Sequence, residues 1–248
     1  MIRKLTTLTA MAVLALTPAC ADSGSSVNTA DREEIEQIVR EYILEHPEVI
    51  EEALTLLVQR DRLAAEQAAQ AAITENHDAL YNNANDHFIG PADAEIVLVE
   101  FFDYRCGFCK RSVDWVQDLP GEYDGKVKVV FKELPIFGGI SETAALAALA
   151  AGEQGKYFEY HLALMKLKSN DDLTESKLDE IANEIGIDAK KMRADMRSMD
   201  VQKQLAEMKS LARALNVDGT PGFFIGDRRF EGAYTEEIEA IISDMLKN

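Results

Sequence analysis

The sequence predicts an α/β domain that carries a large helical insertion and follows a separate N-terminal helical segment. Three observations support this fold class. Apolar residues recur at helical spacing over residues 31–75, and a continuous apolar run of strand length covers EIVLVEFFD, residues 95–103. A second strand pattern, KVKVVFKELPI, begins at Lys126, and a long helical pattern over about residues 141–215 then separates it from later strand patterns.

The first 21 residues have the pattern of an export signal. Arg3 and Lys4 precede an apolar stretch that ends near Ala19-Cys20-Ala21, a small-residue cleavage sequence. The stretch is too short to span a membrane. We therefore expect cleavage after Ala21 and a soluble mature chain in the periplasm. A lipid anchor at Cys20 is the other interpretation, but Thr17 stands where a lipobox prefers Leu, so we favour cleavage.

The mature chain is acidic. Loss of the two basic residues of the signal takes the formal net charge from −18 to −20 for residues 22–248. Nucleic acid is therefore not an expected partner, because phosphates would be repelled. The length of this chain allows one large domain or one domain with an appendage.

The N-terminal part of the mature chain predicts a tether followed by helices. Residues 22–30 are small and polar, as in a flexible tether. Asp31 is a candidate cap for a first helix, and Pro47 suits the first turn of a second. These thin amphipathic helices need a partner surface, either their own domain or other copies of the chain, and the sequence leaves both open. Residues 76–88, rich in Asn and Asp, form either a hinge or a cap.

The domain that begins near residue 89 carries the chemistry. After the strand at residues 95–103 come Cys106 and Cys109, and KRSVDWVQDL then continues at helical spacing. At the start of a helix, free backbone N–H groups and the helix dipole stabilise a thiolate at Cys106. Cys109 lies one turn further in, so we expect Cys106 to attack disulfides and Cys109 to resolve the mixed disulfide.

Two other uses of this cysteine pair have less support. A zinc site needs further ligands, but there is no second cysteine pair, and the four histidines show no paired spacing. A disulfide that closes a loop of two residues would restrain the unfolded chain very little. We therefore expect redox exchange without a metal or a cofactor.

The order strand, CxxC, helix, together with the helical insertion and Gly219-Thr220-Pro221, resembles the DsbA family of thioredoxin-fold thiol-disulfide oxidoreductases over residues 89–248. The form FFDYRCGFCK, joined to DREEIEQIVREYILEHPEVIEEAL, is similar to the suppressor-of-copper-sensitivity C (ScsC) proteins. The resemblance implies a thioredoxin fold and an oligomerisation role for residues 31–88. A homo-oligomer such as a trimer, assembled through residues 31–75, is therefore expected.

The resemblance also implies roles for single residues. Thr220 and Pro221 match a cis-proline loop that presents a backbone edge to substrate peptides. Glu100 matches a buried acid beneath the cysteines, whose raised pKa would let it move the proton of Cys109, although an exposed acid at the strand edge is the alternative. Lys132 either tunes Glu100 or is solvated. Phe108, between the cysteines, is expected to be exposed and to contact unfolded chains.

Some neighbouring residues are predicted to be structural. We expect Phe101 and Phe102 to pack on the two faces of their strand. Met192, Met196 and Met199 recur at helical spacing, and we expect core packing rather than copper ligation.

The expected function is disulfide isomerisation or formation in exported proteins. Gly107 and Phe108 supply no histidine between the cysteines, so we expect a weaker oxidant than a Pro-His form, which favours isomerisation. The expected partners are unfolded or misfolded exported proteins and a membrane redox partner. The alternative is a copper-binding or chaperone-like periplasmic module that uses the same thiols.

Overall fold

The computed structural model describes residues 29–247, so the predicted export signal, Cys20 and most of the tether lie outside the described residues. The chain divides into two compact units, one up to Gln59 and one from Arg60 to Asn248. None of the helices within residues 29–247 has both the length and the apolar character needed to cross a membrane.

The first unit is helical, as predicted. It contains α1 (Thr29–Glu45) and the first part of α2 (Glu48–Glu75). Asp31 lies inside the first turn of α1 and not at its cap. The carbonyl oxygen of Pro47 accepts the N–H of Ile50 over 3.1 Å, so Pro47 directly precedes the second helix. The apolar side chains of this unit are exposed: Ile35, Ile38, Val39, Tyr42, Leu44, Val49, Ile50, Leu54, Leu56, Leu57 and Val58.

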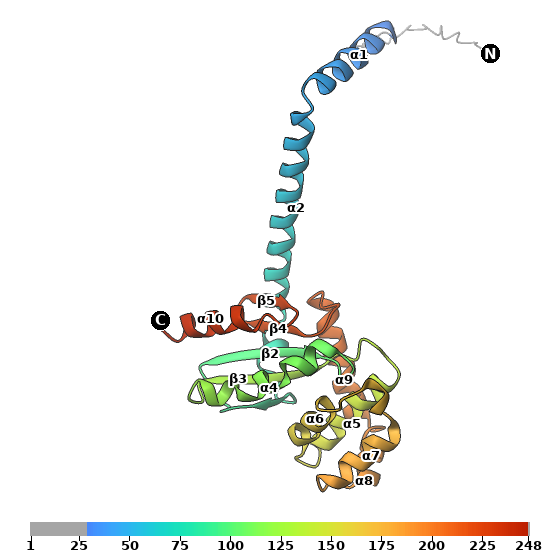
Figure 1. Ribbon diagram of the computed structural model, residues 1–248, viewed down its shortest axis with the longest axis vertical. Helices are drawn as coiled ribbons and strands as arrows, with labels where there is room; N and C mark the ends of the chain where they lie inside the picture. Colours follow the sequence, from blue (N-terminus) through green and yellow to red (C-terminus); the bar gives the residue numbers. More distant parts are fainter. Residues whose placement is uncertain (1–28, 248) are drawn as a thin grey trace, which may run out of the picture. The chain divides into compact units, whose positions relative to one another are not determined.

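The second unit is built on a five-stranded sheet (Figure 1). In spatial order the strands are β1 (His87–Ile89), β3 (Val127–Glu133), β2 (Ile96–Phe102), β4 (Gly222–Ile225) and β5 (Arg228–Glu231). The β2 and β3 strands pair in parallel, and every other pair is antiparallel. The strands predicted from the apolar runs are therefore present and adjacent.

Helices cover both faces of the sheet, so β2 is buried on both sides. Phe102 packs with one core cluster, to which α4 (Gly107–Glu122) and α10 (Thr235–Met245) contribute. Phe101 packs with a second cluster, which contains residues of α3 (His77–Tyr81) and of the end of α9 (Met199–Ala214). The prediction that these two phenylalanines lie on opposite faces is confirmed.

The helical insertion follows β3 and is close to its predicted bounds. Its elements are α5 (Ile140–Gly152), α6 (Tyr157–Met165), the 3-10 turn Asn170–Asp172, α7 (Glu175–Glu184), α8 (Ala189–Asp195) and α9 (Met199–Ala214). Met192 and Met196 are buried as expected, whereas Met199 is 87% exposed, so its predicted core packing is wrong. Met199 is the first residue of α9, where the side chain meets solvent rather than the core.

The segment at residues 76–88 is part of the folded second unit. It forms α3 and the start of β1, and Leu80 and Tyr81 are buried. The hydroxyl of Tyr81 donates to the carbonyl oxygen of Gly226 over 2.8 Å. The sequence leaves open whether this segment is a hinge or a cap. In the structure its residues Leu80 and Tyr81 belong to one of the two core clusters of the sheet.

Candidate active site

The two cysteines lie where β2 is followed by α4. Cys106 is the N-cap of α4, with an extended backbone, and Cys109 is in the first turn. The backbone N–H of Cys109 donates to the Sγ atom of Cys106 over 3.3 Å. Both residues are free thiols in this structure. The side chains are both buried, with 4% of Cys106 and 1% of Cys109 exposed.

The surroundings of Cys106 favour its thiolate. Hydrogen bonding lowers the pKa of Cys106 to about 6, with the largest contribution from the side chain of Cys109. The backbone N–H groups of Cys109 and Phe108 act in the same direction, as expected at a helix start, while burial opposes them. At neutral pH the nucleophilic form of Cys106 therefore predominates.

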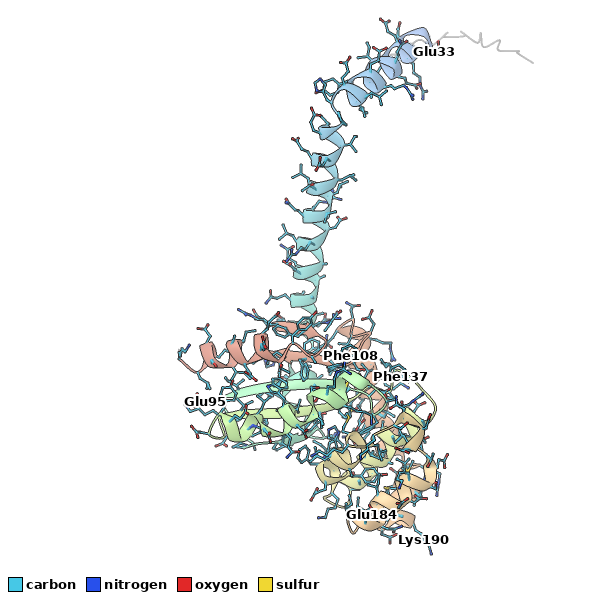
Figure 2. The ribbon with its side chains drawn as sticks, in the orientation of Figure 1. Glu33, Glu95, Phe108, Phe137, Glu184 and Lys190 are labelled. Carbon is cyan, nitrogen blue, oxygen red and sulfur yellow. The ribbon has the colours of Figure 1, made fainter. Side chains whose placement is uncertain are left out.

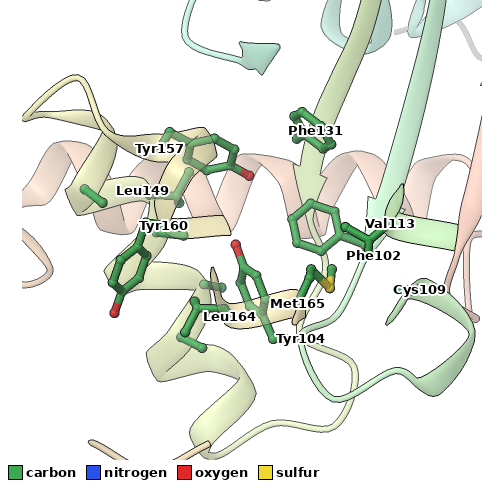
Figure 3. Packing of buried hydrophobic residues seen from close by; sticks show 14 of the residues in the cluster. Phe102, Tyr104, Cys109, Val113, Phe131, Leu149, Tyr157, Tyr160, Leu164 and Met165 are labelled. Atoms are coloured by element: carbon green, nitrogen blue, oxygen red, sulfur yellow. The ribbon is translucent and has the colours of Figure 1, made fainter. Parts of the chain in front are cut away.

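The surroundings of Cys109 have the opposite effect. Burial raises the pKa of Cys109 far above its ordinary value, and the side chain of Cys106 and the charge of Glu100 raise it further. Cys109 belongs to the same buried cluster as Val113 and Phe102, all of which Figure 3 labels. Cys109 therefore stays protonated while Cys106 is a thiolate. In a mixed disulfide Cys106 carries no charge, so the part of this pKa increase at Cys109 that comes from Cys106 disappears, while the part that comes from burial remains.

The loop that contains Thr220 and Pro221 faces Cys106. The Thr220–Pro221 peptide bond is cis, as the resemblance implied. The Sγ atom of Cys106 donates to the carbonyl oxygen of Thr220 over 3.1 Å. The Oγ1 atom of Thr220 is buried without a hydrogen-bond partner, and the side chain of Thr220 contributes to the lowered pKa of Cys106.

Glu100 is a buried acid in β2, beneath the cysteines. It is 2% exposed, so the alternative of an exposed acid at the strand edge is wrong. Burial raises the pKa of Glu100 to about 8, and the charge of Cys106 contributes in the same direction. A carboxyl group with this pKa can both accept and release a proton near neutral pH. Its role in moving the proton of Cys109 stays a prediction.

Lys132 is neither solvated nor among the groups that shift the pKa of Glu100. Its side chain is fully buried, so it is not solvated. Phe101, the neighbour of Lys132 across the parallel pair, lies on the sheet face opposite to Glu100. The Nζ atom of Lys132 instead donates to the carboxylate of Asp86 and, over 2.7 Å, to the carbonyl oxygen of Ala79. Lys132 is a structural ion-pair partner beneath the sheet.

A buried polar network next to the cysteines was not anticipated. The carboxylate of Glu133, at the end of β3, accepts hydrogen bonds from Tyr104 over 2.8 Å and from Tyr157 over 2.9 Å. The Tyr104 hydroxyl also lies 3.2 Å from Nδ1 of His161. Burial raises the pKa of Glu133 and lowers that of His161 to about 3. The network fastens Tyr104, two residues before Cys106, to helix α6 of the insertion.

The carboxylate of Asp103 also stabilises the turn before Cys106 through hydrogen bonds. Its Oδ1 atom accepts from the backbone N–H of Arg105 over 2.7 Å and from the hydroxyl of Ser141 over 2.8 Å. Its Oδ2 atom accepts from the backbone N–H of Phe137 over 3.2 Å. The turn before Cys106 is thus held to the loop after β3. The one sequence signal for Asp103 and Tyr104 was their position beside the cysteine pair.

Phe108 is 58% exposed, as expected, while its contact with clients stays a prediction. It lines an open groove of about 490 Å³ together with residues of the cis-proline loop and of the turn before α10. The other lining residues are Gly219, Thr220, Glu231, Gly232, Ala233 and Tyr234. The groove runs beside the nucleophile, so Thr220 and Phe108 share one surface.

The histidines of the second unit do not converge on the cysteines. The ring of His87 stacks on that of Tyr157, with centroids 4.0 Å apart, and His161 contacts Tyr104. His77 is exposed. Among residues 29–247, no group of three or more His, Cys, Asp or Glu side chains is arranged to hold a metal ion. That the protein works without metal or cofactor stays a prediction.

Comparison with protein families covers both units. Residues 82–244 match the family described as Thioredoxin. Residues 31–64 match the N-terminal domain of the copper resistance protein ScsC. The two matches follow the two parts that the sequence resemblance distinguished.

Solved structures agree with these matches. ScsC of Proteus mirabilis in a transitional conformation is 31% identical, with a TM-score of 0.65, over 89% of this chain and 99% of that chain. A thioredoxin-like oxidoreductase from Silicibacter pomeroyi DSS-3 is 35% identical, with a TM-score of 0.65, over 70% of this chain and 99% of that one. The thiol-disulfide exchange protein α-DsbA2 from Wolbachia pipientis is 28% identical, with a TM-score of 0.66, over 74% and 98% of the two chains.

The curated relatives are much longer proteins. The Na⁺/H⁺ antiporter NhaA 3 of Salinispora tropica is 32% identical over 163 residues, which is 65% of this chain and 24% of the antiporter. The chain spans about a quarter of the length of the curated relatives it matches. Their transport activity is therefore not assigned to it. Its family matches and solved neighbours show that the chain belongs to the thioredoxin family, among the DsbA-like thiol-disulfide oxidoreductases that include ScsC.

Proposed function

We propose that this protein forms or rearranges disulfide bonds in exported proteins of the periplasm. The observation that carries the proposal is the opposed acidity of its thiols, with a lowered pKa at Cys106 and a raised pKa at Cys109. The export-signal pattern supports the compartment. So does the likeness to a periplasmic thioredoxin-like protein from Salmonella enterica serovar Typhimurium, which is 25% identical with a TM-score of 0.60, over 69% of this chain and 96% of that one.

The first step is attack by Cys106 on a client disulfide. The thiolate of Cys106 forms a bond to one client sulfur, the client S–S bond breaks, and the other client sulfur leaves as a thiolate. The product is a mixed disulfide between Cys106 and the client. No net electron transfer has occurred at this point, because one disulfide has replaced another.

The mixed disulfide has two outcomes. In isomerisation, another client thiolate attacks the client sulfur of the mixed disulfide, so a new client disulfide forms and Cys106 leaves as a thiolate. In net reduction, Cys109 loses its proton and attacks the sulfur of Cys106, and the client leaves as a dithiol while the protein becomes oxidised. Disulfide formation is the reverse of net reduction. A membrane redox partner would then restore the oxidised or reduced state of the protein.

Glu100 is suited to accept the proton of Cys109 during this second step. The charge of Cys106 is one cause of its raised pKa. Formation of the mixed disulfide removes that charge, so the pKa of Glu100 falls just when a base is needed. The carboxyl group becomes protonated as it takes the proton of Cys109, and the Cys109 thiolate then attacks the sulfur of Cys106.

We also propose that residues 31–75 assemble a homo-oligomer such as a trimer. The apolar side chains of α1 and the start of α2 support this, since Ile38, Leu54 and Val58 are 59%, 57% and 67% exposed. An open hollow of about 520 Å³, lined by Pro47, Ile50, Leu54, Val58 and neighbouring polar residues, gives another chain a surface to fill. Several active sites on one particle would increase avidity for a misfolded client.

The test is reactivation of a scrambled-disulfide substrate in glutathione buffer by the chain from residue 22 onward. We expect reactivation by the wild-type protein and none by Cys106→Ser. The double variant Leu54→Asp and Val58→Asp should sediment as a smaller species and should oxidise reduced clients without reactivating scrambled ones. Gln67→Asp, at an exposed polar position further along the same helix that does not line the hollow, is the control.

Each outcome bears on a different part of the proposal. Reactivation by the smaller species at the wild-type rate would contradict a role for assembly in isomerisation. An unchanged sedimentation coefficient in the double variant would contradict assembly through this surface. If the wild-type protein neither reactivates the scrambled substrate nor oxidises reduced thiols, the proposed function is wrong.

A further inference from the structure

Two arginines flank the active-site cysteines without a carboxylate partner. Arg105 directly precedes Cys106, and Arg111 follows Cys109 by two residues. Neither arginine belongs to an ion pair among the described residues 29–247. In a chain with a formal net charge of −18, unpaired guanidinium groups beside the nucleophile are available for an anion from outside.

Both arginines are held over exposed aromatic rings. The guanidinium carbon of Arg111 lies 4.2 Å from the ring centroid of Phe108, and that of Arg105 lies 5.7 Å from the ring centroid of Phe137. The two phenylalanines are 58% and 52% exposed, and Figure 2 shows both in the second unit. A guanidinium stacked on a ring keeps its edge N–H groups free to bind a carboxylate.

These four residues, called the Arg–Phe rim below, are fixed relative to Cys106. Phe108 lies between the cysteines, in the first turn of α4. The carboxylate of Asp103 binds the backbone N–H groups of both Arg105 and Phe137, so this second pair is fastened to the turn that ends at Cys106. Arg105, Phe108 and Arg111 thus lie within five residues of Cys106 along the chain, and Asp103 holds Phe137 to the same turn.

Several other charged groups near the cysteines are already engaged. The Nζ atom of Lys110 donates to the carbonyl oxygen of Leu167 over 3.1 Å, in addition to two longer contacts at the end of α6. Glu231, which lines the groove beside Phe108, is paired with Arg229. Asp103 is 1% exposed and binds backbone N–H groups. The side chain of Asn170 donates to the carbonyl oxygen of Arg105 over 2.9 Å, so the exposed acids Asp171 and Asp172 lie near this end of the rim, where the carboxylate of Asp172 accepts the N–H of Ser169. The positive charge that a docked client meets at the rim comes from the two guanidinium groups of Arg105 and Arg111.

We propose that the Arg–Phe rim binds extended client segments in which the reacting cysteine is flanked by Asp or Glu residues. This inference rests on the proposed function. The client carboxylates bind the edges of Arg105 and Arg111, a geometry in which guanidinium and carboxylate fit as a pair. Apolar client side chains pack on Phe108 and Phe137. Because the rest of the chain is acidic, the sign of charge favours such a segment at the rim, beside Cys106.

The test uses short peptides that contain one cysteine, blocked as a disulfide with the neutral leaving group 2-thiopyridine. The residues on both sides of the cysteine are Asp, Asn or Lys in three otherwise identical peptides. The thiolate of Cys106 attacks the peptide sulfur, the peptide–thiopyridine bond breaks, and release of the thione gives the second-order rate constant. The ratio of rates for the Asp and Asn peptides does not depend on the pKa of Cys106, because the same thiolate attacks both peptides and its fraction cancels in the ratio.

We expect the wild-type protein to react about tenfold faster with the Asp peptide than with the Asn peptide at low salt, if each arginine contributes as a good surface pair does. The Lys peptide should be slowest, and added salt should reduce the differences. The double variant Arg105→Gln and Arg111→Gln should bring the ratio close to one, while Arg105→Lys and Arg111→Lys should leave an intermediate ratio. Arg197→Gln, at an exposed unpaired arginine between α8 and α9, is the control and should keep the wild-type ratio.

A wild-type ratio close to one, or a ratio that survives in the double Gln variant, would overturn the inference. So would an equal loss of the ratio in Arg197→Gln, because overall charge would then explain the preference. In all of these outcomes the Asn peptide still reacts, and the proposed function stands. If none of the peptides reacts with Cys106, the proposed function itself fails.

Discussion

The backbone N–H of Cys109 donates to the sulfur of Cys106 over 3.3 Å, within a single turn of helix α4. This contact is one of several that separate the acidities of the two thiols. The pKa of Cys106 is lowered to about 6, while burial raises that of Cys109. The difference fixes the order of events, since Cys106 must attack first and Cys109 ionises more easily once Cys106 is bound to a client.

The reactivity of Cys106 should follow its lowered pKa. We expect the rate of alkylation of the reduced protein by iodoacetamide to rise with a midpoint near pH 6, where the thiolate forms. Cys106→Ser should remove this phase, and Arg197→Gln should leave it in place. A midpoint near the ordinary value of 9.0 would contradict the account of the helix N-terminus.

The same pKa should make the stability of the reduced protein depend on pH. The folded pKa lies below the ordinary value, so between about pH 6 and pH 9 the unfolded chain binds more protons at Cys106 than the folded chain does. The contribution of Cys106 to the free energy of unfolding is therefore present above pH 9 and lost as the pH falls through 6. Urea unfolding of the reduced protein and of Cys106→Ser should show a difference that grows with pH across this range. A difference independent of pH would contradict the prediction.

Thr220→Val should raise the pKa of Cys106. The buried hydroxyl of Thr220 has no hydrogen-bond partner in the reduced structure, and its side chain helps to lower this pKa, so we expect it to bind the Cys106 thiolate. A hydrogen bond is worth about 1 kcal/mol, so we expect the alkylation midpoint to move upward by less than about one pH unit. Valine has a similar shape, and the melting temperature of the oxidised protein checks that the fold is intact. An unchanged midpoint would show that the hydroxyl does not contact the thiolate.

Glu100→Gln should slow the resolving step without slowing the first attack. Glutamine keeps the shape of the side chain but cannot accept a proton, and loss of such a base costs about a hundredfold in rate. The lifetime of a mixed disulfide, measured by quenched mass spectrometry, should lengthen, while the alkylation rate of Cys106 should not fall. Glu95→Gln, at an exposed acid just before β2, is the control. If the mixed disulfide resolves at the wild-type rate, Glu100 does not move the proton.

Lys132→Met should destabilise the fold without changing the chemistry at Cys106. The side chains of Lys132 and Asp86 are 1% and 3% exposed, so removal of the lysine leaves a buried carboxylate without its partner. Loss of one member of such a pair costs about 3 to 5 kcal/mol in the free energy of unfolding. Adding Asp86→Leu should recover most of that loss. A shifted alkylation midpoint in the folded single variant would contradict the structural role given to Lys132.

The fold was largely predictable because the long elements carry strong patterns. The run at β2 is apolar on both faces, and the insertion keeps helical spacing close to its observed bounds. The short elements α3 and β1 were missed because five and three residues are too few to show a period. They form because Leu80 and Tyr81 fill a space beneath the sheet. Met199 was misassigned because helical spacing alone does not say where the core ends.

The site was predictable where residues are close in sequence or matched the family pattern. The spacing of Cys106 and Cys109 was sufficient for that pair, whereas Glu100 came from the family resemblance, and the sequence left open an exposed acid at the strand edge. The partners of Lys132 and Glu133 were not predictable, because Asp86 and Tyr157 lie 46 and 24 residues away along the chain. Only the packing of β1, β3 and α6 brings these groups together.

The most direct test of the account is Cys109→Ser incubated with a reduced or scrambled client protein. Serine cannot resolve the mixed disulfide, so the account predicts that a covalent adduct accumulates through Cys106 and disappears on reduction. The added variant Cys106→Ser should abolish it. If no adduct forms with any such client while Cys106 is still alkylated readily, thiol-disulfide exchange with proteins is not what these two cysteines do.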